Sequence, residues 1–177
     1  MSDKPQTTRN KISCVLSSDD AQIIFIDTPG MHKPKHKLGE YMVQTVETTL
    51  KEVDVILFMV NALEPKGAGE DYIFERLSTI KTPIILVVNK IDTIDKNSLL
   101  PIIAQYHKVR DFSAVVPISA LNKTNLTVLV DEIKKHLAPG PQYYPTDMIT
   151  DQPERLIVAE LIREKILQRT REEIPHA

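Results

Sequence analysis

The chain has 177 residues, 42% of them hydrophobic, a length that suits one domain of ordinary size with an appendage. Its 22 basic and 24 acidic side chains give a net charge of −2, so no overall basic field indicates nucleic-acid binding. The single cysteine, Cys14, excludes a disulfide framework, fits a reducing compartment and is expected to be a packed thiol. The first residues are polar, unlike a signal peptide, and no apolar run approaches the roughly 20 residues of a membrane span. We therefore expect a cytoplasmic protein without a transmembrane segment.

Five apolar, β-branched runs predict strands, and stretches of helical period lie between the later ones. The strands are expected at residues 11–16, 21–26, 54–60, 83–88 and 114–118, and the helices at 38–53, 73–80, 99–106 and 126–137. Residues 17–20 are a short hairpin connection between the first two runs. Beyond it strand and helix alternate and the runs are continuously apolar, which predicts an α/β fold with a doubly wound, mostly parallel sheet.

A boundary is expected after residue 138. Residues 136–153 contain four prolines and one glycine and have no period, so residues 139–152 are interpreted as a linker. Beyond the linker, residues 153–177 return to a strong helical pattern with one apolar side. An isolated helix of this size is marginal in water, so this segment is expected to be the first element of a second domain.

Polar residues follow three of the predicted strands. Asp27-Thr28-Pro29-Gly30 follows the second run, Asn89-Lys90-Ile91-Asp92 the fourth, and Ser119-Ala120 the fifth. Each segment alone is compatible with an ordinary turn or a helix cap. In a doubly wound sheet, however, ligands bind beyond the carboxyl ends of the strands. The three segments together, in this order, therefore predict a guanine-nucleotide site.

The chemistry of guanine explains the residues after the fourth and fifth strands. The Asp92 carboxylate can accept both N–H donors of guanine's N1 and N2 edge, a pair that adenine does not offer. Asn89 can hold the loop and reach the base, and the stem of Lys90 can lie across the ring. A backbone N–H near Ala120 would donate to guanine O6.

The segment after the second strand suits a metal and a phosphate. Mg²⁺ prefers carboxylate and phosphate oxygens, so Asp27 is placed to bind this ion through a water molecule. Gly30 offers a backbone N–H that can approach a γ-phosphate closely because glycine has no side chain.

With these motifs the sequence resembles the Era GTPases of bacteria, which assist assembly of the small ribosomal subunit. The matching stretches are KPQTTRNKI (4–12), FIDTPGMHKPKHKLGEYM (25–42), NKID (89–92), ISAL (118–121) and REKILQRTREEIPHA (163–177). The resemblance implies that Thr8 is the switch threonine that binds Mg²⁺, that Asp27 to Met31 form the second switch, and that Asn89 to Asp92 read the base. It also implies GTP or GDP with Mg²⁺ as ligands, the small ribosomal subunit and its RNA as partners, and peripheral membrane association.

Two departures from the Era pattern shape the expected activity. No segment of the form G-x-x-x-x-G-K-[ST] occurs in the sequence, so we expect an incomplete G domain at residues 1–138 that lacks the first strand, the phosphate loop and the first helix. Residues 153–177 resemble only the first helix of the family's KH domain. The chain is therefore expected to be cut at both ends, and to be inactive or strongly impaired as a GTPase.

Two functional hypotheses remain from the sequence. One is an Era-type GTPase in truncated form, and the other is a non-enzymatic remnant or scaffold that binds ribosome or partner surfaces. A flavodoxin-like or receiver-like domain is a rival at the level of the fold, but neither explains NKID and ISAL together. Without its first strand, the second predicted strand is expected either to close onto the third or to leave the chain poorly stable.

Overall fold

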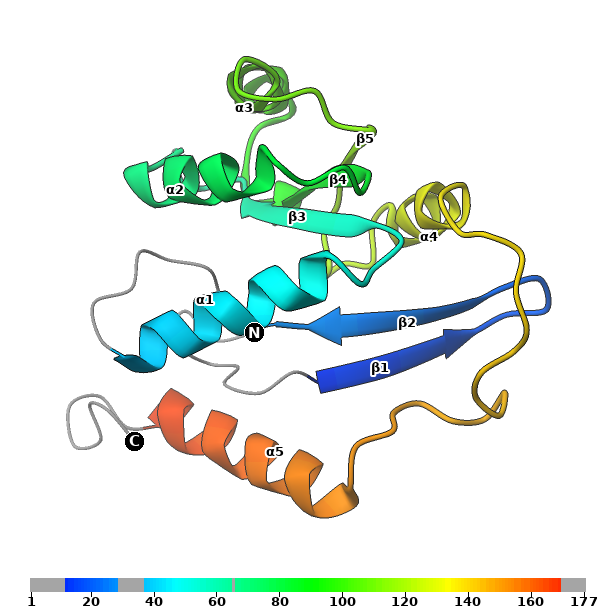
Figure 1. Ribbon diagram of the computed structural model, residues 1–177. Coiled ribbons are helices and arrows are strands. Elements are labelled where there is room, and N and C mark those ends of the chain that lie inside the picture. The colour runs from blue at the N-terminus through cyan, green and yellow to red at the C-terminus, as the bar shows by residue number, and fades with distance from the viewer. Residues whose placement is uncertain (1–11, 29–36, 65, 170–177) are drawn as a thin grey trace.

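The computed structural model describes residues 12–28, 37–64 and 66–169 (Figure 1). The strands are β1 (Ile12–Ser17), β2 (Gln22–Asp27), β3 (Ile56–Asn61), β4 (Ile84–Asn89) and β5 (Ala114–Pro117). The helices are α1 (Lys37–Leu50), α2 (Ala68–Leu77), α3 (Lys96–His107), α4 (Leu126–Lys134) and α5 (Glu154–Arg169), with a 3₁₀ turn, η1 (Ile91–Thr93). Each predicted strand and helix is present, within a few residues of its expected bounds, and the α/β class is confirmed.

The strand β4 is the centre of a parallel three-stranded sheet in the order β3-β4-β5. All six of its residues are buried, and they alternate between two cores. Ile84, Leu86 and Val88 belong to one core, with residues of α1, α2 and α3. Ile85 and Val87 belong to the other core, with residues of α4 and of β2. Helices therefore cover both faces of this sheet, as the sequence predicts.

The β1–β2 hairpin forms a second, antiparallel sheet of its own. Among the described residues, β2 is paired with β1 and not with β3, so the first of the two alternatives, closure of the second strand onto the third, does not occur. The hairpin is held instead by side chains. Ile23 lies in the core shared with Ile85 and Val87, and the ammonium of Lys134 on α4 bonds to Asp20 in the hairpin turn at 2.7 Å.

The expectation of a packed thiol at Cys14 is also wrong, because this side chain is exposed. Along β1 the burial alternates, with Ser13 and Val15 buried and Cys14 and Leu16 exposed. This is the pattern of a strand with one covered face, whereas the prediction assumed a strand covered on both faces.

The linker after α4 is fastened to the hairpin. The side chain of Gln22 acts as a clamp: its Oε1 accepts the N–H groups of Tyr143 (3.0 Å) and Tyr144 (2.9 Å), and its Nε2 donates to the Tyr144 carbonyl (2.9 Å). Farther along, the Val15 N–H donates to the carbonyl of Ile149 at 2.7 Å. The segment contains no helix or strand, yet it covers the outer edge of β1 with hydrogen bonds. The domain boundaries proposed from the sequence stay a prediction.

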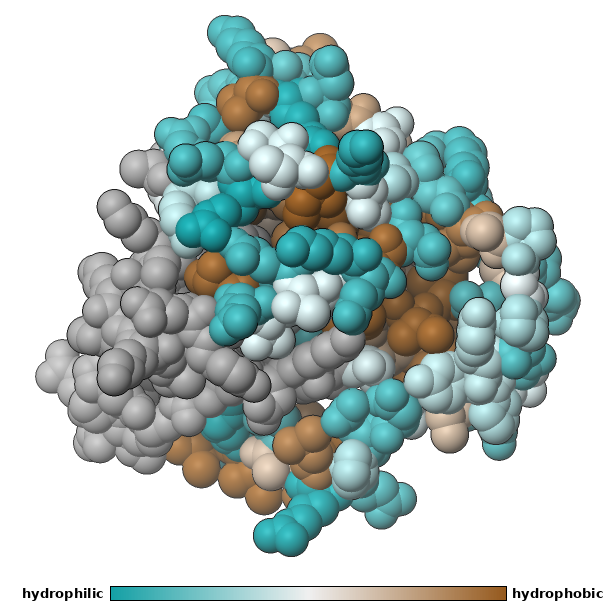
Figure 2. Space-filling view, viewed as in Figure 1, coloured by the Kyte–Doolittle hydropathy of each residue, from teal (hydrophilic) through white to brown (hydrophobic). Residues whose placement is uncertain are grey.

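Helix α5 follows this linker and leaves an apolar face uncovered. Val158, Leu161, Ile162 and Ile166 are all exposed. Figure 2 shows hydrophobic side chains along the lower edge of the molecule, where Figure 1 places α5. Within the described residues, no helix is long and apolar enough to cross a membrane.

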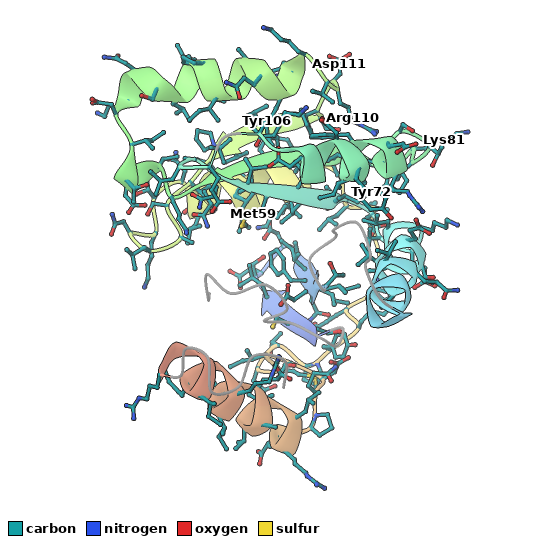
Figure 3. All side chains as sticks on the ribbon, turned by 90° about the vertical axis from the view of Figure 1, so that its left-hand side faces the viewer. Met59, Tyr72, Lys81, Tyr106, Arg110 and Asp111 are labelled. Atoms are coloured by element: carbon teal, nitrogen blue, oxygen red, sulfur yellow. The ribbon has the colours of Figure 1, made fainter. Side chains whose placement is uncertain are left out.

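A buried tyrosine ties α3 to α2 (Figure 3). The hydroxyl of Tyr106 donates to the carboxylate of Glu70, with 3.1 Å to each oxygen, and Tyr106 packs against Phe74. Arg110 donates to the carbonyls of Leu77 and Ile80 and so closes the carboxyl end of α2. Burial raises the pKa of Glu70 above its ordinary value, although the Tyr106 hydroxyl lowers it in part. The pKa of Tyr106 is also raised, first by burial and then by the Glu70 charge, so its hydroxyl remains a donor at neutral pH.

Replacing Gln22 by Ala should release the linker from the hairpin. The variant loses three hydrogen bonds to the linker backbone, which should lower the free energy of unfolding by about 1–3 kcal/mol. Hydrogen exchange of the Tyr143 and Tyr144 amides should accelerate. Gln142→Ala is the matched control, since its exposed amide bonds to Tyr144 only two residues away. Equal protection of both amides in wild type and Gln22→Ala would contradict this role of the clamp.

Replacing Glu70 by Gln should stabilise the chain at neutral pH more than at acid pH. The carboxyl group has a raised pKa when folded, so its contribution to stability is fully present below the unfolded value near 4.5 and is lost as the pH rises through the folded pKa. A neutral amide removes this loss while still accepting from Tyr106. Melting temperatures of wild type and variant at pH 4 and pH 7 measure the difference. Glu75→Gln, at an exposed position of the same helix, is the control, and a pH-independent difference for Glu70→Gln would contradict the assignment.

Candidate functional site

The candidate site lies beyond the carboxyl ends of β4 and β5. These strands are parallel neighbours, with Val88 opposite Pro117. The pairing continues past the strands, because the Ile118 N–H donates to the Val88 carbonyl (2.8 Å) and the Ile91 N–H donates to the Ile118 carbonyl (3.2 Å). The two predicted motifs, NKID and ISAL, are therefore held side by side by backbone hydrogen bonds.

The side chain of Asn89 joins the two loops at their centre. Asn89 is the last residue of β4 and is 6% exposed. Its Oδ1 accepts the N–H of Lys90 at 2.8 Å and the N–H of Ala120 at 3.1 Å. A single buried oxygen thus fixes the first residue of one loop relative to the backbone of the other.

This geometry bears on the role expected for Ala120. The sequence predicts that a backbone N–H near Ala120 donates to guanine O6. In the structure the Ala120 N–H donates to Asn89, so Asn89 and a bound base would share the same donor. The serine before it, Ser119, is fully buried.

Lys90 and Asp92 begin a tight turn after β4. Lys90 has positive φ (66°) and precedes the 3₁₀ turn η1. Its carbonyl accepts both the N–H (3.1 Å) and the hydroxyl (2.6 Å) of Thr93. Asp92 lies within this turn and is exposed, while Ile91 is half-buried and packs on the first core. The turn therefore presents one carboxylate to solvent beside the Asn89 bridge.

The remaining predicted residues belong to the hairpin side. Asp27 ends β2 and is exposed, and Thr28 is half-buried. Thr8, Pro29, Gly30 and Met31 lie outside the described residues. The described residues bring together Asn89, Lys90, Asp92 and Ser119-Ala120, whereas Asp27 stands on the separate sheet.

The chain is similar to known GTPases in both sequence and structure. The model of a family described as the 50S ribosome-binding GTPase matches residues 1–90. A crystal structure of Era in complex with MgGDPNP and nucleotides 1506–1542 of 16S ribosomal RNA is 43% identical, with a TM-score of 0.91 over 98% of this chain and 59% of that chain. The chain belongs to the Era family of ribosome-binding GTPases.

A second Era structure, from Aquifex aeolicus and bound to GDP·AlF₄⁻, is also 43% identical, with a TM-score of 0.89 over 98% of this chain and 60% of that chain. The chain thus spans about three fifths of the length of these two Era structures. The elongation factor SelB from Methanococcus maripaludis is 19% identical, with a TM-score of 0.57 over 68% of this chain and 26% of that chain, and it shows the fold alone.

Two residues that hold the loops or the linker in place lie outside the motifs identified from the sequence. Gln22 clamps the linker, and Asn125 donates from its side chain to the Pro117 carbonyl at 2.8 Å below the second loop. The run N-K-T-N (122–125) is typical of a turn with positive φ, which is the one sequence signal that points to Asn125. No comparable signal marks Gln22.

Proposed function

We propose that this chain carries the base-recognition part of a guanine-nucleotide site and that its role is that of an Era-type factor in assembly of the small ribosomal subunit, with nucleotide binding and turnover impaired. The observation that supports this most directly is the Asn89 bridge between the NKID and ISAL loops. It ties the two loops to each other at the place where the base is proposed to bind.

In this proposal each side chain of the first loop has one task. The Asp92 carboxylate is exposed and accepts the N1 and N2 hydrogens of guanine, which gives selectivity over adenine. Asn89 holds Ala120 in place for guanine O6, and the Lys90 stem covers the ring. Two charge-assisted hydrogen bonds to Asp92 would be worth about 1.5–3 kcal/mol each.

In this proposal, most ligands of the Mg²⁺ ion come from the phosphates of the nucleotide and from water. The described residues contain no cluster of three or more His, Cys, Asp or Glu side chains that could hold a metal ion. Asp27 offers a single carboxylate, which fits a Mg²⁺ ion that takes its other ligands from phosphate oxygens and water. We assign a water-mediated contact to Asp27 and a direct contact in the triphosphate state to Thr8.

We expect binding of GTP by this chain to be weak and turnover to be absent. The sequence contains no G-x-x-x-x-G-K-[ST] segment, which in such GTPases supplies backbone N–H groups, a lysine and a hydroxyl to the phosphates. Losing three or four charge-assisted bonds of about 1.5–3 kcal/mol each removes roughly 5–12 kcal/mol. This corresponds to a loss of roughly 10⁴- to 10⁹-fold in affinity.

A second candidate function is a non-enzymatic scaffold that binds ribosome or partner surfaces. The exposed apolar face of α5 favours this function, because covering such a face with the apolar surface of a partner lowers the free energy. This function needs no nucleotide turnover. In both proposals the protein acts in the cytoplasm, and peripheral membrane association remains part of the Era-type proposal.

Titration with nucleotides tests the proposed base site. The chain should bind GDP in the millimolar range with a measurable preference over ADP, and should release no phosphate from GTP above buffer. Changes in amide chemical shift measure the affinities. Binding of GTP at micromolar concentration, or hydrolysis, would contradict the expected impairment.

The variant Asp92→Asn tests which residue reads the base. The amide offers one donor and one acceptor in place of two acceptors, so preference should move from GDP to xanthosine diphosphate, whose exocyclic oxygen needs a donor. Asp95→Asn, at the exposed position before α3, is the matched control. If Asp92→Asn still prefers GDP as wild type does, Asp92 does not read the base.

RNA binding by this chain should be weak. Helix α5 carries Arg155, Arg163, Lys165 and Arg169 against Glu154, Glu160 and Glu164, and Arg163 is paired with Glu160. Phosphate neutralisation supplies most non-specific affinity, and nearly balanced charge supplies little. An anisotropy titration with the 3′ end of small-subunit ribosomal RNA should show binding that disappears at about 0.2 M salt. Tight binding at that salt concentration would place an RNA contact elsewhere on the chain.

A further inference from the structure

The loop from Ser119 to Asn125 is closed at its base. The N–H of Ser119 donates to the Thr124 carbonyl (3.2 Å), and the N–H of Thr124 donates to the Ser119 carbonyl (3.0 Å). Inside the loop, the Asn122 N–H donates to the buried hydroxyl oxygen of Ser119 at 3.1 Å. The backbone that carries Ala120 is therefore tied to Thr124 by hydrogen bonds.

Asn125 fastens this unit to the sheet. Its Nδ2 donates to the carbonyl of Pro117, the last residue of β5, at 2.8 Å. Its backbone is left-handed (φ 58°, ψ 17°), and its carbonyl accepts the N–H of Leu129 in α4 at 3.0 Å. One residue thus links the end of β5, the loop and the start of α4.

Residues with positive φ are found in both of the loops that are proposed to bind the base. In the described part of the chain, the non-glycine residues with positive φ are Lys90, Lys123 and Asn125. Lys90 begins one base loop, and the other two end the second. Such conformations are sparsely populated and persist where the surroundings enforce them, often at binding sites.

We propose that Asn125 is a positioning residue for guanine recognition, holding the second loop so that the Ala120 backbone stays bonded to Asn89. This inference rests on the proposed function and names a residue outside the NKID and ISAL motifs. The chain of contacts is continuous: Pro117 carbonyl to Asn125 side chain, Thr124 to Ser119 backbone, and Ala120 N–H to Asn89 Oδ1. Without the first contact, the loop keeps its internal bonds and the pairing of Ile118 with β4, but its far end loses the side-chain link to β5.

Two substitutions separate this contact from the role of Asn125 in the backbone. Asn125→Gly adopts a left-handed conformation without strain and has no side-chain donor. Asn125→Asp keeps the size and the tolerance for positive φ, but its carboxylate cannot donate to the Pro117 carbonyl. Asn122→Asp is the matched control for charge, since the Asn122 side chain is exposed and makes no hydrogen bond to the described residues.

The experiment measures two quantities on ¹⁵N-labelled chain. The first is hydrogen exchange of the Ala120 amide without ligand, which should accelerate at least tenfold in both Asn125 variants and stay within twofold in Asn122→Asp. The second is the ratio of the affinities for GDP and ADP, which should fall by about three- to tenfold in the Asn125 variants. Melting temperatures are recorded beside both, because a residue that only caps α4 would lower stability without changing the ratio.

Each result decides between the roles. Unchanged Ala120 exchange together with an unchanged nucleotide ratio in both variants would overturn the proposal, and so would lower stability with an unchanged ratio. A wild-type chain without preference for GDP would refute the proposed function, and recognition through Asn125 with it. A wild-type chain that prefers GDP while the variants do not supports both.

Discussion

The strand β4 is buried on both faces and paired along both edges, and the other elements take their places around it. Its even and odd residues supply two separate cores, one beneath α1, α2 and α3 and the other beneath α4 and the hairpin. With β3 and β5 occupying its edges, β4 reaches a polar environment at its carboxyl end. The residue there, Asn89, is buried too, and its oxygen is satisfied by the backbone of two loops. A buried polar oxygen must find such partners, so the packing of β4 itself draws the two loops together.

The hairpin is attached by a different kind of interaction. No strand pairing joins it to the parallel sheet among the described residues, so its position depends on Ile23 in the second core, on the Lys134–Asp20 contact and on the linker. In the contact of Lys134 with Asp20 the carboxylate is largely solvent-exposed, so this ion pair contributes little by itself. The Gln22 clamp, by contrast, satisfies two backbone N–H groups and one carbonyl with a single side chain. The linker therefore serves as an edge cover for β1 as well as a connection to α5, which places α5 relative to the hairpin that ends in Asp27.

The sequence predicted what depends on local pattern and missed what depends on individual side chains far apart in the chain. Continuous apolar runs located all five strands, and the polar residues at their ends pointed to the Asn89 loop. The Gln22 clamp could not be predicted, since it joins residues 122 positions apart and leaves no periodic signal. The Cys14 prediction failed because an apolar run does not reveal whether one face or two will be covered. The same limitation applied to the break between β2 and β3, where pairing is decided by neighbours and not by strand composition.

The two parts of the proposed nucleotide site, for the base and for the phosphates, are attached to the fold in different ways. The base loops are held by backbone hydrogen bonds that continue a buried sheet, and loss of the Asn89 acceptor would leave the Ala120 N–H without its partner at a cost of about 1–3 kcal/mol. These hydrogen bonds therefore make the arrangement of the two loops part of the fold of the parallel sheet. Asp27 lies on the hairpin, outside that sheet, and its strand β2 is attached to β4 through the packing of Ile23 and not through strand pairing. A nucleotide that spans both would thus meet a formed surface at its base and a separately supported carboxylate at its phosphates. In the proposed function, selectivity for guanine therefore depends mainly on the fold of β4 and β5, whereas affinity depends on groups that approach the phosphates.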